Sequence, residues 1–127
     1  MSDVPDELLY SEEHLWVEWT DDVVTIGLTD YGQAELGDMI FVELPAIEES
    51  FTRLDVFGTI EAAEAVTELF SPLGVTVLET NLRLAKEPTL VNSDPYGEGW
   101  LVRLRPKSLP ERDELLGALE YREHIGD

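Results

Sequence analysis

Short segments rich in β-branched and aromatic residues recur along the chain, and turn-forming residues separate them. Residues 15–19 and 23–28 flank a turn at residues 20–22, which predicts a β-hairpin. Further strands are predicted over residues 38–44, 56–60, 69–70, 75–78 and 100–104. This recurrence of short strands favours a β-rich fold.

Two segments carry helix signals instead. Thr29 is placed to cap a short helix over residues 30–36, which Gly37 closes. Near the C-terminus, Ser108 and Glu111 have the spacing of a capping box, and a helix with an apolar face follows, formed by Leu115, Leu116 and Leu119 and ended by Gly126. The fold class predicted is therefore β-rich α+β, with a short early helix and a C-terminal helix.

Residues 60–66 are ambiguous. They are rich in helix formers, so propensity alone predicts a helix. The β segments on both sides favour a hairpin, and the local pattern does not decide between the two.

Composition narrows the class of protein and of partner. The length of 127 residues predicts a single domain over 1–127. The formal net charge of -20 repels phosphate backbones and anionic lipids, so no nucleic-acid or membrane partner is expected. We see no signal peptide and no membrane span, which favours a cytoplasmic protein.

No side chain is assigned to catalysis. The chain has no cysteine, and its two histidines, His14 and His124, are far apart in sequence, so no metal site is predicted. His14 is expected to be structural, packed near Trp16, and His124 is expected to interact with the last carbonyls of its helix. Paired carboxylates are common by chance in a chain with 28 acidic residues. We therefore expect no enzyme activity.

Four strings in order carry a family resemblance. They are residues 10–16 (YSEEHLW), 26–34 (IGLTDYGQA), 36–45 (LGDMIFVELP) and 90–100 (LVNSDPYGEGW). Together they resemble the H protein of the glycine cleavage system. The resemblance implies a lipoyl/biotinyl-carrier-like barrel-sandwich hybrid. It also implies a carrier, whose lipoyl group on a hairpin lysine takes up the aminomethyl group of glycine.

The lysine of that family aligns with a glutamate here. The family string Glu-Ser-Val-Lys-Ala corresponds to residues 61–65, so Glu64 takes the lipoyl-attachment position, flanked by Glu61, Ala62, Ala63, Ala65 and Glu68. A carboxylate cannot form the lipoyl amide, and the lysines of the chain, Lys86 and Lys107, lie elsewhere. The prediction is therefore that the protein has no cofactor, although lipoate is the cofactor of the family. Further departures at Leu15, Leu54 and Val75 indicate divergence.

The resemblance and Glu64 together predict an H-protein-like docking protein that is a non-carrier partner or regulator. Its expected partners are glycine decarboxylase, aminomethyltransferase, or a lipoyl ligase or transferase. Two alternatives stay open. One is a functional H protein whose lysine is replaced by Glu64 or whose modified residue lies elsewhere, and the other is an unrelated ligand-binding module on the same fold.

Overall fold

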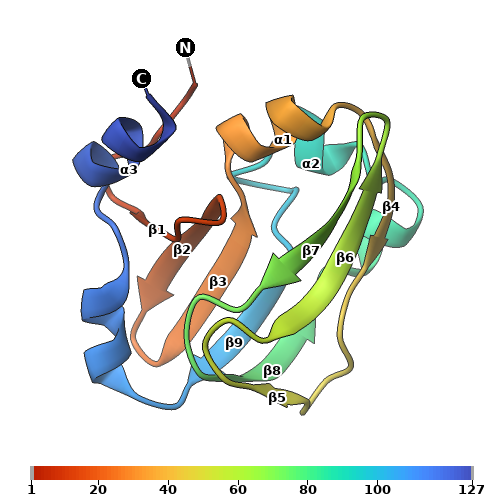
Figure 1. Ribbon diagram of the computed structural model, residues 1–127. Helices are drawn as coiled ribbons and strands as arrows, with labels where there is room; N and C mark the ends of the chain where they lie inside the picture. The colour runs from red at the N-terminus through yellow and green to blue at the C-terminus, as the bar shows by residue number, and fades with distance from the viewer. Residues whose placement is uncertain (1, 127) are drawn as a thin grey trace.

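The computed structural model describes residues 2–126, which form two antiparallel β-sheets facing each other (Figure 1). The larger sheet has the strand order β1-β2-β3-β9-β8-β5, and the smaller sheet has the order β4-β6-β7. The strands are β1 (Leu9–Tyr10), β2 (Leu15–Thr20), β3 (Val23–Leu28), β4 (Met39–Glu43), β5 (Ser50–Phe51), β6 (Val56–Ala62), β7 (Val66–Phe70), β8 (Val75–Thr80) and β9 (Val102–Pro106).

Short helices connect and cover these sheets. The α-helices are α1 (Asp30–Leu36), α2 (Leu90–Ser93) and α3 (Ala118–Ile125), and the 3-10 helices are η1 (Leu82–Ala85) and η2 (Leu109–Glu114). This two-sheet architecture, with one early and one C-terminal helix, agrees with the predicted fold class. The sequence pattern did not reveal β1, β5, η1 or α2, each four residues or shorter.

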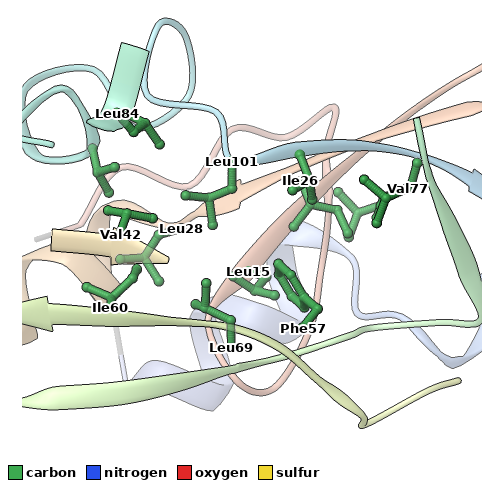
Figure 2. Packing of buried hydrophobic residues seen from close by; sticks show 14 of the residues in the cluster. Leu15, Ile26, Leu28, Val42, Phe57, Ile60, Leu69, Val77, Leu84 and Leu101 are labelled. Carbon is green, nitrogen blue, oxygen red and sulfur yellow. The ribbon is translucent and has the colours of Figure 1, made fainter. Parts of the chain in front are cut away.

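The main core lies between the two sheets (Figure 2). Val24, Ile26 and Leu28 of β3 point inward, because alternate side chains of a strand share one face. Ile60 of β6 and Leu69 of β7 approach them from the smaller sheet. Burial of each such aliphatic side chain stabilises the fold by about 1.5–3 kcal/mol.

Both ends of α1 are as predicted. Thr29 accepts a hydrogen bond at its Oγ1 from the Gly32 N–H at 3.1 Å, which caps the first turn. Gly37 ends the helix with φ of 80° and donates its N–H to the Gln33 carbonyl oxygen. Local signals therefore place α1 correctly.

The C-terminal helix begins later than predicted. Ser108 makes no side-chain capping bond, and Glu111 instead accepts from the Gly74 N–H at 3.0 Å. The chain leaves η2 in an extended conformation at Leu115, because Leu116 exchanges two backbone hydrogen bonds with Tyr10. The predicted single helix with an apolar leucine face is therefore wrong.

A second apolar cluster joins the two ends of the chain. Val4 and Leu8 pack with Tyr10 of β1 and with Tyr121 of α3. The rings of Tyr10 and Tyr121 are stacked with centroids 4.7 Å apart, and both side chains are fully buried. This cluster fixes α3 against the edge of the larger sheet.

Among residues 2–126, no helix combines the length and apolar character needed to cross a bilayer.

Candidate functional site

The β6–β7 hairpin ends in an exposed tip at residues 63–65 (Figure 1). Glu61 on β6 and Val66 on β7 form the last strand pair, and the Ala62 N–H donates to the Ala65 carbonyl oxygen at 2.9 Å. Because β6 lies between β4 and β7, the ladders on both sides take up its backbone groups. The stretch that the sequence left ambiguous is therefore a hairpin.

The tip is tied to the connection between α1 and β4. The Ala63 N–H donates to the Asp38 carbonyl oxygen at 2.9 Å, and the Glu64 N–H donates to the Leu36 carbonyl oxygen at 3.0 Å. A Cβ atom on Gly37 would lie 3.2 Å from the Glu64 Cγ, so the side chain at position 64 lies close against this glycine. These contacts make the tip a supported platform rather than a free loop.

The structure exposes most of the positions predicted from the sequence, namely Glu61, Ala63, Glu64, Ala65 and Glu68. Ala62 differs, since it is only 6% exposed and belongs to the core. Glu68 lies four residues after Glu64, on β7, where it lines a pocket.

That pocket, which we call the α1–β7 pocket, has a volume of about 180 Å³. Its lining comes from the loop before β2, the end of β3, α1 and β7, and consists of Glu13, His14, Leu28, Tyr31, Gly32, Glu35, Leu36, Thr67, Glu68 and Leu69. Apolar side chains line part of it, and three carboxylates bring negative charge. Two lining residues connect the pocket to the hairpin tip: Leu36 accepts the hydrogen bond of the Glu64 N–H, and Glu68 follows Glu64 by four residues on β7. The pocket and the tip are therefore treated as one candidate site.

His14 is a titratable group of this pocket whose pKa is perturbed. Its pKa is lowered from 6.5, mainly because partial burial penalises the charged ring, and further by His124, while Glu35 opposes the shift. The ring Nδ1 lies 2.8 Å from the phenolic oxygen of Tyr121. His14 is therefore neutral at pH 7.

A neutral His14 leaves the charge of the surrounding carboxylates uncompensated. Glu13, Glu35 and Glu68 all line the pocket, and Glu35 accepts a hydrogen bond from the Tyr31 hydroxyl at 3.0 Å. A solvent-accessible pocket with net negative charge and partly apolar walls favours a small ligand that carries an amine.

Both histidines have surroundings that differ from those predicted. The His14 ring lies beside Tyr31, with centroids 5.0 Å apart, whereas the Trp16 ring lies beside Tyr96. His124 donates from Nε2 to the Glu12 carbonyl oxygen at 2.9 Å, not to the last carbonyls of α3. Among residues 2–126, no group of three or more metal-ligating side chains is arranged to hold a metal ion.

Sequence reasoning missed Tyr31, Glu35 and Tyr121 as parts of the site. The spacing of Tyr31 and Glu35, four apart on a predicted helix, was a signal that they share a face. No local signal pointed to Tyr121, because it is 107 residues away from His14.

Comparison with known proteins supplies names for this architecture. The family described as "Glycine cleavage H-protein" matches residues 8–127. The chain is 47% identical to the glycine cleavage system H protein of Mycolicibacterium gilvum over 131 residues, which covers 100% of both chains. It is 44% identical to the protein of the same name from Staphylococcus carnosus, over 98% of both chains.

A solved structure agrees as well. The crystal structure of a glycine cleavage system H protein from Mycobacterium marinum superposes with a TM-score of 0.88 at 31% identity. The superposition covers 97% of this chain and 99% of that one.

These matches overturn the prediction that the protein has no cofactor. That prediction rested on Glu64 and on the places of Lys86 and Lys107 in the sequence, whereas the match spans residues 8–127 and points to a family whose cofactor is lipoate. One residue at the attachment position does not outweigh similarity along the whole chain. The carboxylate of Glu64 excludes a lipoyl amide at position 64 and at no other position.

Proposed function

The chain belongs to the glycine cleavage H-protein family, and on that premise we propose that it is the H component of a glycine cleavage system. In this role it presents the β6–β7 tip to the enzymes of the system and carries an aminomethyl group on lipoate. The observation that carries the proposal is the supported, exposed tip at Glu64 beside the acid-lined α1–β7 pocket.

Position 64 is proposed as the attachment position of the family. Its backbone N–H is held by the Leu36 carbonyl oxygen, and its small neighbours Ala63 and Ala65 leave the apex accessible. A lysine there would present its amine at the apex of the hairpin. Glutamate has no amine, so no lipoyl amide forms at residue 64 of the present sequence.

The carrier proposal therefore takes two forms. In one form, the protein that acts as the carrier has lysine at position 64, where the present sequence has glutamate. In the other, lipoate is attached to Lys86, which follows η1, or to Lys107, which follows β9, and both of these residues are exposed. In Figure 1, β9 ends at the opposite side of the molecule from the hairpin tip, which argues against attachment after β9 for a shared site with the pocket.

The pocket supports a carrier of an amine. An aminomethyl group is a cation at neutral pH, and the three carboxylates around neutral His14 stabilise a positive charge. Apolar residues such as Leu28 and Leu69 suit the hydrocarbon part of an arm. The same pocket then shields the cargo between visits to different enzymes.

A second candidate is favoured by Glu64 itself. In it, the chain docks onto the partner enzymes without delivering cargo and so regulates them. Proposed partners for either role are glycine decarboxylase, aminomethyltransferase, and a lipoyl ligase or transferase. An acidic tip would steer toward basic clefts in such partners. The cytoplasmic location and the single domain stay predictions.

Coexpression with a lipoyl ligase and lipoate tests the carrier proposal. Intact mass and peptide mapping of the wild type, Glu64→Lys and the matched control Ala65→Lys would locate the modification. The carrier proposal expects a lipoyl group on residue 64 in Glu64→Lys, with little on residue 65 in the control. If neither wild type nor Glu64→Lys is lipoylated, the carrier proposal fails.

A reconstituted glycine cleavage reaction separates the two candidates. Used as the sole H component, a lipoylated chain should support glycine decarboxylation. Added to a reaction that already contains a lipoylated H protein, the wild-type chain should inhibit if it only docks. Absence of both effects would count against both candidates.

A further inference from the structure

Tyr121 of α3 lies between two polar side chains of the candidate site. Its phenolic oxygen is 2.8 Å from Thr29 Oγ1 and 2.8 Å from His14 Nδ1. We propose that Tyr121 is a positioning residue that holds the His14 ring as a neutral, Nε2-protonated wall of the α1–β7 pocket. The inference deepens the proposed function and rests on it, because it assigns a role to this pocket.

The direction of the hydrogen bonds follows from Thr29. Its side chain is fully buried, and its oxygen already accepts the Gly32 N–H at 3.1 Å. Among residues 2–126, the acceptor within reach of the Thr29 hydroxyl proton is the oxygen of Tyr121. Because a buried hydroxyl proton needs an acceptor, Thr29 donates to Tyr121.

In the proposed arrangement, Tyr121 donates its phenolic proton to His14 Nδ1, 2.8 Å away. A ring nitrogen that accepts a hydrogen bond carries no proton, so Nδ1 of His14 is unprotonated. In a neutral imidazole the proton must then be on Nε2. The hydrogen bonds therefore form a relay, from the Gly32 N–H to Thr29, from Thr29 to Tyr121 and from Tyr121 to His14 in the wall of the pocket.

The groups around His14 are consistent with a neutral ring. His124 of α3 faces it with ring centroids 5.7 Å apart, and a second imidazole disfavours a charge on the first. From α1, Tyr31 lies at 5.0 Å between centroids and Glu35 favours the charged form. The Tyr121 hydroxyl favours the neutral form, because it donates to a lone pair that protonation would remove.

Two further carboxylates face the same pocket. Glu13 precedes His14 in its own loop, and Glu68 projects from β7. A neutral His14 leaves these charges available to an amine, whereas a protonated His14 would compete with it. The relay thus keeps the pocket suited to a cationic group.

The position of His14 depends on the packing of α3 against the rest of the protein, because Tyr121 belongs to α3. Tyr121 is fully buried and stacks on Tyr10, and Arg122 donates to the Val4 carbonyl oxygen at 2.7 Å and to Asp6 at 3.1 Å. Loss of these contacts would withdraw the phenolic proton from His14. The C-terminal helix is therefore part of the candidate site, not only a cover for the sheet edge.

Nitrogen-15 NMR of the histidine rings tests the inference. In the wild type, we expect shifts of a protonated Nε2 and an unprotonated Nδ1 for His14. In Tyr121→Phe, we expect a mixture of the two tautomers and a rise of the His14 midpoint by about half to one pH unit, which corresponds to the loss of one hydrogen bond to the neutral form.

Tyr10→Phe is the matched control. It removes a phenolic oxygen from the other ring of the same stack, one that donates to the Pro5 carbonyl oxygen and does not contact His14. The control should leave the His14 tautomer and midpoint unchanged. A purely structural role of Tyr121 would make the two variants alike.

Two results would overturn the inference. One is protonation of His14 on Nδ1 in the wild type, a measurement that does not depend on the folding of any variant. The other is a folded Tyr121→Phe with unchanged His14 shifts and midpoint. These measurements need no lipoate and no partner enzyme. If NMR shows the expected tautomer of His14 but the glycine cleavage assay fails, the proposed function is contradicted and the inference about Tyr121 is not.

Discussion

The backbone N–H of Glu64 donates to the carbonyl oxygen of Leu36 at 3.0 Å. This bond joins the apex of the β6–β7 hairpin to the last residue of α1, and α1 also lines the pocket beside the hairpin. Position 64 and the α1–β7 pocket therefore belong to one connected unit. A change in the α1–β4 connection should affect the tip.

Gly37 provides the first test of that unit. Its φ of 80° and ψ of -161° lie in a region that is essentially restricted to glycine, so Gly37→Ala should cost about 1–3 kcal/mol of unfolding free energy. Urea denaturation would measure the loss. In a Glu64→Lys background, the same substitution should also reduce lipoylation of residue 64, because the added Cβ would lie 3.2 Å from the Glu64 Cγ position.

Gly126→Ala is the control for Gly37→Ala. Gly126 has the same φ of 80° but a ψ of 23°, and a Cβ there would meet nothing within 4 Å. We expect a cost of about 1 kcal/mol and no effect on the tip. Equal losses in stability and lipoylation for both variants would contradict a specific role of Gly37.

Leu54 is a leucine with a φ of 73°, in the left-handed region that disfavours a β-carbon. The strain of about 1–2 kcal/mol exceeds the entropic cost of glycine, about 0.5–1 kcal/mol, and the side chain is 52% exposed. Leu54→Gly also loses the buried half of the leucine side chain, about 1 kcal/mol, so these terms nearly cancel and the unfolding free energy in urea should change by no more than about 0.5 kcal/mol. Arg53→Gly, next to it but without a positive φ, should destabilise the protein.

Salt should stabilise this protein. Its 28 Asp and Glu against 8 Lys and Arg produce self-repulsion in the compact state. Among residues 2–126, the ion pairs are few and exposed, such as Arg103–Glu79 and Arg122–Asp6, so screening removes little attraction. The urea midpoint should rise between about 0.01 M and 1 M salt, over which the Debye length falls from about 30 to 3 Å. A flat or falling midpoint would contradict this.

The pH dependence of stability should include a contribution from His14. Its pKa is lowered from 6.5 in the folded protein, so the unfolded chain binds more protons in the window below 6.5. Stability from this group is therefore present above 6.5 and is lost as the pH falls through that window. Urea denaturation of the wild type and of His14→Gln across this range would show a shallower loss in the variant. A loss in His14→Gln as steep as in the wild type would refute the contribution.

Several local predictions agree with the structure because neighbouring residues decide them. The cap at Thr29 and the glycine end at Gly37 depend on backbone groups within one helical turn. The β2–β3 hairpin follows from two alternating segments around a short turn. The structure places residue 64 at the exposed apex of the β6–β7 hairpin, and its assignment as the attachment position stays a prediction.

Other predictions failed where distant segments compete with local preference. Ser108 and Glu111 have the spacing of a capping box, yet Glu111 binds the Gly74 N–H. Residues 115 and 116 become extended because Leu116 pairs with Tyr10. The inference from Glu64 to the absence of a cofactor failed for a different reason, since it weighed one residue against the whole chain.

The amino-acid sequence alone determined three features. They are most of the short strands, the threonine cap and the glycine end of α1, and the carboxylate at position 64. Only tertiary structure decided that residues 60–66 form a hairpin and that Tyr121 meets His14. β6 pairs with the distant β4 as well as with β7, and the His14–Tyr121 contact spans 107 positions. Local propensity contributes about 1 kcal/mol or less per residue, so contacts between distant segments decide where the two disagree.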